Sequence, residues 1–296
     1  MSRASYRKFP LRVCRRTALS PGFVRITLHD ESVAGMVTHA PDQRVKLFFP
    51  LADGTLPAFP DGDDWYAAYR AMPAAIRPPM RTYTIRALRA AQHEVDVDFV
   101  LHGDGGPASA WAMRADIDDG LVMLAPDAGF DGTPDGFEWR DPFGLRQVLL
   151  IGDETAVPAI AGILEQLADA PEPPRVVALL EVPRAADRLD LRAPANAALH
   201  WLPRDGAPHG SRLQAVLHRL MPAHHATDAE AARLEIDLDS EILWERSAAG
   251  DHGFHAWIAC ESAAAMAMRR HLIGALDIDR RAVACMGYWR LGRALD

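Results

Sequence analysis

Residues 81–86, Arg81-Thr82-Tyr83-Thr84-Ile85-Arg86, decide how the first half of this chain is interpreted. Their threonine, tyrosine and isoleucine content is typical of a β-strand. On a strand, Arg81 and Tyr83 lie on the same face, because side chains alternate between the two faces. A guanidinium group matches the geometry of phosphate oxygens, and an aromatic ring can stack on a flat heterocycle. The stretch is therefore either a strand that binds a phosphate and a flat ring, or ordinary strand sequence.

A glycine-rich loop follows, with the sequence His102-Gly103-Asp104-Gly105-Gly106-Pro107-Ala108-Ser109. Its glycines allow backbone N–H groups to approach a pyrophosphate closely, and Ser109 is expected to cap the helix that follows. A glycine-rich loop alone is more often only a turn. Together, the two motifs supply a cation, a flat ring and an anion cradle, which is the combination that a flavin dinucleotide requires.

The N-terminal half around these motifs has the pattern of short β-strands separated by Pro, Gly and Asp residues. Residues 94–101 alternate strictly between hydrophobic and mainly acidic side chains. About six short strands predict a small closed antiparallel β-barrel. The expected strands are residues 11–18, 24–29, 44–50, 81–86, 94–101 and 121–125.

The pattern changes after Gly144, where continuous apolar strands begin to alternate with amphipathic helices. This alternation predicts a parallel sheet covered on both faces. The expected strands are residues 147–151, 175–181, 198–202, 254–259 and 282–288. We therefore expect an N-terminal antiparallel β-barrel domain, residues 1–144, and a C-terminal α/β domain with a parallel sheet, residues 145–296.

The composition limits the possible functions. A chain of 296 residues can form two domains, and a net charge of −8 without a basic run argues against nucleic-acid binding. The cysteines, Cys14, Cys260 and Cys285, cannot supply the four thiolates of an iron–sulfur cluster. With neither a signal peptide nor a membrane-spanning segment, we expect a cytoplasmic monomer. The adjacent His224 and His225 diverge on a helix or strand, which favours a solvated surface, and no metal site is predicted.

The chain resembles a known family, the FAD-dependent siderophore-interacting proteins, which are ferric-siderophore reductases related to ferredoxin reductases. The matching segments occur in the family's order and span nearly the whole chain. One departure is Ala259-Cys260-Glu261, where the family commonly has Ala-Gly-Glu, and it leaves the local backbone conformation open. The matching segments are Arg81-Thr82-Tyr83-Thr84-Ile85-Arg86, His102 with Gly106-Pro107-Ala108-Ser109 and Trp111, Gly152-Asp153-Glu154-Thr155-Ala156-Val157-Pro158, and Gly287-Tyr288-Trp289-Arg290.

The resemblance implies that the N-terminal barrel, of the ferredoxin reductase type, binds FAD and that the C-terminal domain binds NAD(P)H. We expect Arg81 at the pyrophosphate, Tyr83 stacked on the isoalloxazine and the Thr84 hydroxyl near N5, so that Tyr83 and Thr84 lie closest to the chemistry. Arg86 is either a second phosphate contact or a solvated strand residue. The other expected FAD-binding residues are Thr82, Val100, His102, Gly106, Pro107, Ala108 and Ser109.

The NAD(P)H site is expected at the carboxyl end of the first parallel strand, where parallel sheets bind nucleotides. The two carboxylates of Asp153 and Glu154 suit a phosphate poorly, and Thr155 could simply cap a helix, but the resemblance favours a dinucleotide contact. Arg184 and Arg188 either hold the ribose phosphate of NADPH or face solvent, and we favour NADPH. The expected contacts are Asp153, Glu154, Thr155, Ala156, Arg184, Arg188, Glu261, Tyr288, Trp289 and Arg290. The last three are expected to fold back over the flavin, with a core position for Trp289 as the alternative.

The implied function is that of an NAD(P)H-dependent ferric-siderophore oxidoreductase. NADPH would pass a hydride to FAD, and reduced flavin would deliver single electrons to Fe(III), which hard-oxygen chelators hold far more tightly than Fe(II). Lys46 and Arg44 are expected to attract the anionic ferric siderophore, although Lys46 could instead extend into solvent from the barrel edge. Two alternatives remain: a flavin reductase that serves a protein electron acceptor, and a non-catalytic siderophore-binding carrier.

Overall fold

The computed structural model describes residues 4–51, 53–56, 64–140, 144–223, 236, 238, 241–248 and 253–293. The chain divides into two compact units, residues 1–137 and residues 138–295, and each unit is built on its own sheet. This division falls slightly before the boundary that the sequence places between residues 144 and 145. Among the described residues, no helix has the length and apolar character that crossing a bilayer requires.

The N-terminal unit contains a seven-stranded sheet in the order β4-β3-β7-β1-β2-β6-β5. All neighbouring strands run antiparallel, and Val45 of β3 pairs with Tyr83 of β4. The antiparallel arrangement confirms the predicted class of this unit. The strands are β1 (Tyr6–Ser20), β2 (Phe23–His29), β3 (Arg44–Phe48), β4 (Met80–Thr84), β5 (Ala87–Arg89), β6 (Glu94–Val100) and β7 (Gly120–Pro126).

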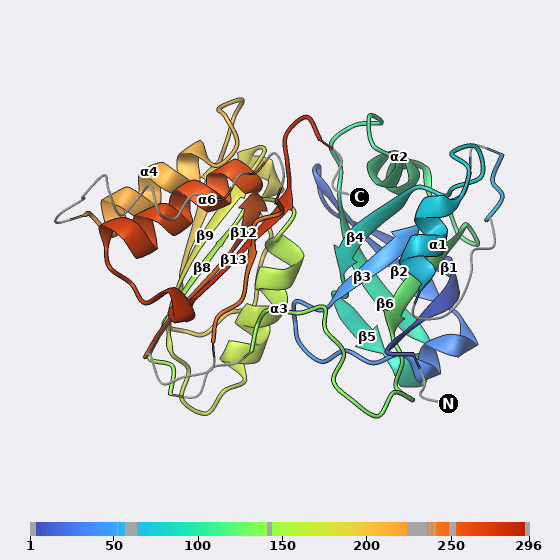
Figure 1. The fold of residues 1–296 in the computed structure, drawn as a ribbon, viewed down its shortest axis with the longest axis horizontal. Coiled ribbons are helices and arrows are strands. Elements are labelled where there is room, and N and C mark those ends of the chain that lie inside the picture. The colour runs from blue at the N-terminus through green and yellow to red at the C-terminus, as the bar shows by residue number, and fades with distance from the viewer. Residues whose placement is uncertain are drawn as a thin grey trace. The chain divides into compact units, whose positions relative to one another are not determined.

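This sheet curls because its two edge strands follow one another in the chain. Strand β4 ends at Thr84 and β5 begins at Ala87, so only Ile85 and Arg86 connect the two edges. The Ile85 N–H donates to the Gln43 carbonyl beside β3, and the Arg86 N–H donates to the carbonyl of Asp96 in β6. The predicted closed barrel of about six strands is therefore a curled sheet of seven strands (Figure 1), in which the strand expected at residues 81–86 ends at Thr84 and a further short strand, β5, follows it.

Hydrophobic side chains fill the inside of the curl. Strand residues such as Phe9, Leu47 and Val97 form this core together with Ala108 and Ala112 of helix α2 (Pro107–Arg114). A second, smaller cluster lies on the other face of β3 and β4, where helix α1 (Trp65–Ala71) packs over Phe48, Met80 and Leu124. The aromatic side chains of this short helix therefore serve to cover the sheet.

The C-terminal unit contains a six-stranded sheet in the order β10-β9-β8-β12-β13-β11. Five strands run parallel, and β11 pairs antiparallel with β13. The predicted parallel sheet is confirmed for these five strands, and β11 makes the sheet mixed; its two residues are too short to produce a recognisable strand pattern. The strands are β8 (Gln147–Gly152), β9 (Arg175–Val182), β10 (Ala198–Pro203), β11 (Trp244–Glu245), β12 (Phe254–Glu261) and β13 (Val283–Trp289).

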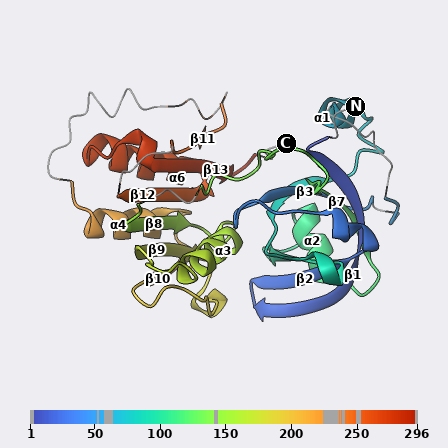
Figure 2. The ribbon, with the colours of Figure 1, turned by 90° about the horizontal axis from the view of Figure 1, so that it is seen from below.

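Helices cover both faces of this sheet, as Figures 1 and 2 show. Helices α4 (Ser211–Leu220) and α6 (Ser262–Arg270) share one core cluster with β8 and β12, whereas α3 (Val157–Ala168) packs against the opposite face. The strand order reverses direction between β8 and β12. In sheets of this type, ligands bind at the carboxyl ends of the strands beside such a reversal.

Candidate functional site

The two faces of β4 carry different side chains. Tyr83 packs against the core inside the curl, and its ring centroid lies 4.5 Å from that of Phe99 with a tilt of 42°. Met80, on the alternate face, belongs to the outer cluster beneath α1. Burial raises the pKa of the Tyr83 hydroxyl above its usual value. Tyr83 is half-buried, so only the accessible part of its ring is available to a flat ligand.

A chain of aromatic contacts brings the two sequence motifs together. The ring centroids of Tyr83 and Phe99 lie 4.5 Å apart, and those of Phe99 and Trp111 lie 5.7 Å apart. These contacts connect β4 to β6 and β6 to helix α2. The residues that follow β6 form the glycine-rich loop, so the loop and the Arg81–Tyr83 strand belong to one region of the N-terminal unit.

The glycine-rich loop leads directly into helix α2. Gly106 is the N-cap residue, and no side chain accepts a hydrogen bond from the first turn of the helix. A Cβ atom added at Gly106 would lie 3.2 Å from Cε1 of the exposed His102 ring, so the imidazole and the start of the helix are close neighbours. The first turn thus keeps backbone N–H groups, including that of Ala108, without a side-chain cap; Pro107 has no N–H.

Ser109 does not cap this helix, which corrects the expectation from the sequence. Its hydroxyl accepts a hydrogen bond from the His102 N–H at 3.1 Å and donates to the Gly103 carbonyl at 2.7 Å. The residue is buried within the helix, and these two bonds fasten the loop to α2. Val100, the last residue of β6, is also buried. Of these two predicted FAD-binding residues, Ser109 therefore shapes the loop and Val100 ends the strand that carries it.

The groups present here fit a dinucleotide with a flat ring. Arg81 supplies a partly exposed guanidinium group, with Nη1 2.7 Å from the Met80 carbonyl. The uncapped start of α2 supplies backbone donors for a phosphate, and Tyr83 supplies an aromatic surface. Cation, amide donors and ring are the three elements that hold a diphosphate and a heterocycle.

Lys46 and Thr82 form a pair on the opposite face of β4. They are directly cross-strand, and the Lys46 ammonium donates to the Thr82 hydroxyl oxygen at 2.7 Å. Burial, followed by the charge of Arg44, lowers the pKa of Lys46. Thr82 consequently lies with the predicted substrate-binding residues and not with Arg81 and Tyr83. Thr84 is buried on the Thr82 face and pairs across the strands with Arg44.

Arg44 and Arg86 both have internal contacts. The Arg44 side chain donates to the Gly136 carbonyl at 3.3 Å. The Arg86 side chain lies 3.7 Å from the carboxylate of Asp98, which Arg25 binds through two hydrogen bonds of 2.7 and 2.8 Å. Arg86 is thus not the fully solvated residue that the sequence allowed, because a buried carboxylate lies beside it at the junction between β4 and β5, whereas a phosphate contact stays a prediction.

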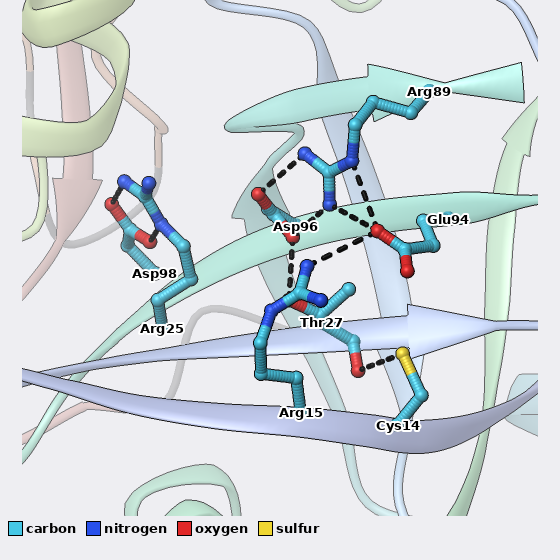
Figure 3. A network of polar contacts seen from close by, with 8 residues as sticks. All are labelled: Cys14, Arg15, Arg25, Thr27, Arg89, Glu94, Asp96 and Asp98. Carbon is cyan, nitrogen blue, oxygen red and sulfur yellow. Dashed lines mark hydrogen bonds and ion pairs between the residues drawn. The ribbon is translucent and has the colours of Figure 1, made fainter. Parts of the chain in front are cut away.

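Beside the Arg25–Asp98 pair, the outer face of β2, β5 and β6 carries a second group of polar contacts, and Figure 3 shows both. Arg89 of β5 binds both Glu94 and Asp96 of β6, and Thr27 of β2 donates to Asp96 at 2.8 Å. Burial raises the pKa of Asp96, but the hydrogen bonds from Arg89 and Thr27 outweigh it and leave the pKa below its usual value. The alternation predicted for this strand is present, and arginine side chains cover its acidic face.

The carboxyl end of the C-terminal sheet is organised by Asp153. One of its carboxylate oxygens accepts hydrogen bonds from the backbone N–H and the hydroxyl of Thr155, at 2.9 and 2.6 Å. The other accepts the Glu261 N–H at 2.9 Å and the Trp289 indole N–H at 2.7 Å. Burial, with the adjacent Glu154 charge, raises the pKa of Asp153, although the hydrogen bonds from the Thr155 hydroxyl, the Trp289 indole and the Thr155 N–H oppose the rise. Asp153 thereby connects the ends of β8, β12 and β13.

Glu154 connects the other half of the sheet. Its carboxylate forms two hydrogen bonds with Arg204, of 2.9 and 2.8 Å, and Arg204 also binds Glu181 at 3.2 Å. Glu181 in turn accepts the backbone N–H groups of Gly210 and Arg212. Arg204 is a residue that the sequence reading missed; its only signal was a cation directly after an apolar strand.

The side chains of Asp153 and Glu154 are therefore occupied by internal partners. A nucleotide bound here would have to contact the backbone of this turn or the Thr155 side chain. Direct contact with the carboxylates of Asp153 and Glu154 stays a prediction. Thr155 is not the helix cap considered as its alternative role, because the N-cap residue of α3 is the fully buried Ala156. The start of α3 carries no side-chain cap.

Glu261 caps the next helix. Its carboxylate accepts the N–H groups of Ala263 and Ala264, at 2.8 and 3.0 Å, and so occupies the start of α6. Cys260 lies buried in β12 and is not among the residues with positive φ, and the pairing of β12 with β13 shifts register directly after it, between Cys260 and Glu261.

The three residues at the end of β13 all have partners inside the C-terminal unit. Tyr288 stacks on Trp244, with ring centroids 5.9 Å apart and planes 8° apart. Trp289 is half-buried and binds Asp153, and the Arg290 guanidinium donates to the Leu238 carbonyl. Their expected position over a flavin remains a prediction.

The predicted contact of Arg184 and Arg188 with NADPH stays a prediction. Both are exposed, and they flank a short 3₁₀ turn that follows β9 at the carboxyl edge of the sheet. Within the described ranges, no three His, Cys, Asp or Glu side chains are grouped so as to hold a metal ion. His224 and His225 fall outside the described residues.

Comparison with known proteins agrees with this arrangement. The family described as the siderophore-interacting FAD-binding domain matches residues 12–130, and the family described as siderophore-interacting protein matches residues 145–292. Ferric vibriobactin reductase ViuB of Vibrio cholerae is 27% identical over 99% of this chain and 94% of its own length. The NADPH-dependent ferric-chelate reductase of Escherichia coli is 30% identical over 79% of each chain. The crystal structure of the siderophore-interacting protein SipS from Aeromonas hydrophila has a TM-score of 0.70 and 27% identity, covering 98% of this chain and 94% of that one.

Proposed function

Because this chain belongs to the siderophore-interacting protein family, we propose that it is an FAD-dependent ferric-siderophore reductase with NADPH as its electron donor. Residues 1–144 bind FAD, and residues 145–296 bind the nicotinamide dinucleotide. Relatives named as a ferric vibriobactin reductase and an NADPH-dependent ferric-chelate reductase support the reaction and the donor.

One observation carries the proposal: Arg81 and Tyr83 share a region with the uncapped start of α2. In this proposal, Arg81 and the first-turn amides bind the diphosphate, and the accessible part of the Tyr83 ring orients the isoalloxazine. Thr84 lies on the Thr82 face but is the last residue of β4, so in this proposal its hydroxyl reaches the reacting edge of the flavin around the end of the strand, and His102 completes the contacts of the loop. FAD, when bound, converts the two-electron donation of a nicotinamide into single-electron reduction of iron.

The donor site is proposed at the carboxyl edge of the C-terminal sheet. Thr155 and the backbone of the turn between β8 and α3 meet the dinucleotide there, and Arg184 and Arg188 bind the ribose phosphate that distinguishes NADPH from NADH. Both arginines are exposed and lie at the same edge as the turn. NADPH preference therefore depends on these two guanidinium groups.

The substrate is an Fe(III) chelate, which Lys46 and Arg44 attract as an anion. Lys46 is fixed by Thr82 and keeps its ammonium group at a partly exposed position on the sheet. One NADPH supplies two electrons, so two Fe(III) become two Fe(II) with release of NADP⁺ and one proton. Oxygen-donor chelators hold Fe(II) weakly, so reduction frees the metal. The iron is a substrate, and the protein is proposed to act as a cytoplasmic monomer.

Anaerobic stopped-flow spectroscopy of the purified holoprotein tests this proposal. Mixing with NADPH should bleach the flavin absorbance faster than mixing with NADH, and a ferric siderophore should then restore it. A colourless protein that still binds ferric siderophore would contradict the proposal and indicate a carrier. Reduced protein that ignores ferric chelates but is reoxidised by a ferredoxin or flavodoxin would indicate a protein acceptor instead.

A further inference from the structure

Trp289 is held in place at three points of its structure. Its indole N–H donates to Asp153 at 2.7 Å, and its backbone carbonyl accepts the Ser262 hydroxyl at 2.9 Å. Its ring also meets the His209 ring edge to face, with centroids 4.6 Å apart and planes at 85°. The side chain nevertheless remains half-buried, so part of the indole is accessible. A fixed aromatic ring with an accessible part resembles a binding surface more than a core position.

The backbone around Trp289 is shaped to produce this position. In the pairing of β12 with β13, Cys260 lies opposite Gly287 and Glu261 lies opposite Trp289, so Tyr288 is an extra residue and forms a bulge. A bulge changes the direction in which the following side chain points. Gly287 permits the close approach of Ser262, because an added Cβ atom would lie 2.4 Å from the Ser262 hydroxyl oxygen.

The two neighbouring helix starts differ in their caps. Glu261 already occupies the first-turn amides of α6, so a phosphate would meet a carboxylate there. The start of α3 has no side-chain cap, and it follows the turn that contains Asp153. Since Asp153 binds the Trp289 indole directly, the open helix start and the ring surface adjoin the same carboxylate.

We propose that Trp289 forms the surface against which the nicotinamide ring of the donor packs, and that Asp153 is the positioning residue that fixes this indole. The inference rests on the proposed NAD(P)H site and deepens it. Oxidised nicotinamide is a flat cation, and among aromatic side chains tryptophan has the face that attracts cations most strongly. Asp153 acts through Trp289 and does not itself meet the dinucleotide.

A double-mutant cycle on the holoenzyme tests this coupling. Trp289→Phe keeps an aromatic ring but removes the indole N–H, and Asp153→Asn removes the carboxylate that binds it. Each variant should raise the KM for NADPH and the Kd for NADP⁺ about tenfold, with a smaller change in kcat, because the ring that packs against the nicotinamide is no longer fixed in place. A tenfold change corresponds to about 1.4 kcal/mol of binding free energy. The double variant should be no weaker than the weaker single variant, since both substitutions break the same contact.

Asp169→Asn is the control, because it changes an exposed carboxylate that binds Arg192 and has no contact with Trp289. Its effect on NADPH KM should multiply with that of Trp289→Phe. Multiplication of the Asp153→Asn and Trp289→Phe effects would overturn the positioning role of Asp153. Unchanged KM and Kd in Trp289→Leu, which removes the aromatic face, would overturn the ring surface. Wild-type protein that neither oxidises NADPH nor binds NADP⁺ would instead refute the proposed function.

Indole NMR keeps the proposal testable if Asp153→Asn fails to fold. The Trp289 indole N–H signal is identified in ¹⁵N-labelled wild-type holoprotein by its absence from Trp289→Phe. Adding NADP⁺ should shift this signal and slow its exchange with solvent, whereas adding phosphate alone should not. A signal that NADP⁺ leaves unmoved would overturn the proposal, whatever the stability of the Asp153 variant.

Discussion

Asp153 and Glu154 are adjacent in the chain, yet their carboxylates bind opposite halves of the C-terminal sheet. Asp153 accepts the Trp289 indole N–H at 2.7 Å on the side of β12 and β13, whereas Glu154 binds Arg204 at 2.8 Å on the side of β9 and β10. Strand β8 lies between these halves. The pair therefore cross-links the edge that parallel sheets use for ligands, and it leaves the backbone of the intervening turn in a defined position.

Glu154→Gln should destabilise the protein strongly. The substitution leaves the buried Arg204 guanidinium with Glu181 as its remaining carboxylate partner, and breaking a buried ion pair costs about 3 kcal/mol or more. Urea unfolding followed by circular dichroism measures the loss. Arg192→Gln is the control, since its ion pair with Asp169 is exposed and its removal should change the free energy of unfolding hardly at all. Equal losses of free energy of unfolding in Glu154→Gln and Arg192→Gln would contradict the conclusion that the Glu154–Arg204 pair stabilises the edge of the sheet.

The pH dependence of stability should reveal Asp153. Burial and the Glu154 charge raise its pKa in the folded state above the ordinary value of 3.8, so the folded protein binds this proton more tightly than the unfolded chain does. This contribution to stability is complete below pH 3.8 and is lost as the pH rises through the raised pKa. As the pH rises from 3.8 through the raised pKa, the free energy of unfolding of the wild type should therefore fall relative to that of Asp153→Asn, as measured by urea titrations. Parallel pH profiles of the two proteins would show that the carboxylate keeps its ordinary pKa.

Tyr83→Ala should weaken FAD binding about tenfold, because the stacking surface and the packing on Phe99 are both lost. Titration of the apoprotein with FAD, followed by quenching of flavin fluorescence, measures the effect. Tyr83→Phe is the matched control: it keeps the ring, and its affinity should stay close to that of wild type. If Tyr83→Phe binds FAD as weakly as Tyr83→Ala does, the residue does not contribute to FAD binding by stacking.

Lys46→Met should raise the KM for anionic ferric chelates by about tenfold and leave that for neutral chelates nearly unchanged, since it removes an attractive charge. Thr82→Val should cause a smaller change in the same direction, because it frees the ammonium group that the threonine hydroxyl holds at 2.7 Å. Both variants should retain the FAD affinity of wild type. Steady-state reduction of a pair of chelates of different charge gives the comparison, and equal changes for both chelates would argue against an electrostatic role.

Asp98→Asn should loosen the junction between β4 and β5. It weakens the two hydrogen bonds from Arg25 and the contact with Arg86, and losing charge-assisted bonds at a buried site costs about 2 kcal/mol. Urea unfolding measures the cost, and the FAD affinity should fall as well because Arg86 follows Thr84 after one residue. Glu94→Gln should cost less, as this carboxylate is more exposed. An Asp98 variant with full stability would show that these contacts do not support the junction.

Much of the fold could be predicted from local sequence patterns. Strict alternation marked β6, continuous apolar runs marked β8 and β12, and the spacing of Ile160, Ile163 and Leu167 marked the buried face of α3. These patterns are readable because neighbouring residues determine the face that each side chain occupies. The two-residue strand β11 offers no such pattern, so the mixed character of the second sheet was missed.

The sequence by itself determined which elements form, the order in which they follow one another and the family to which the chain belongs. Only the tertiary structure decided that Tyr83 packs on Phe99, that Thr82 serves Lys46, and that Asp153 and Glu154 bind opposite halves of a sheet. The reason is physical: strand formation depends on residues close in the chain. The partner of a buried carboxylate depends instead on strand order and register, which bring together groups that lie far apart in the sequence.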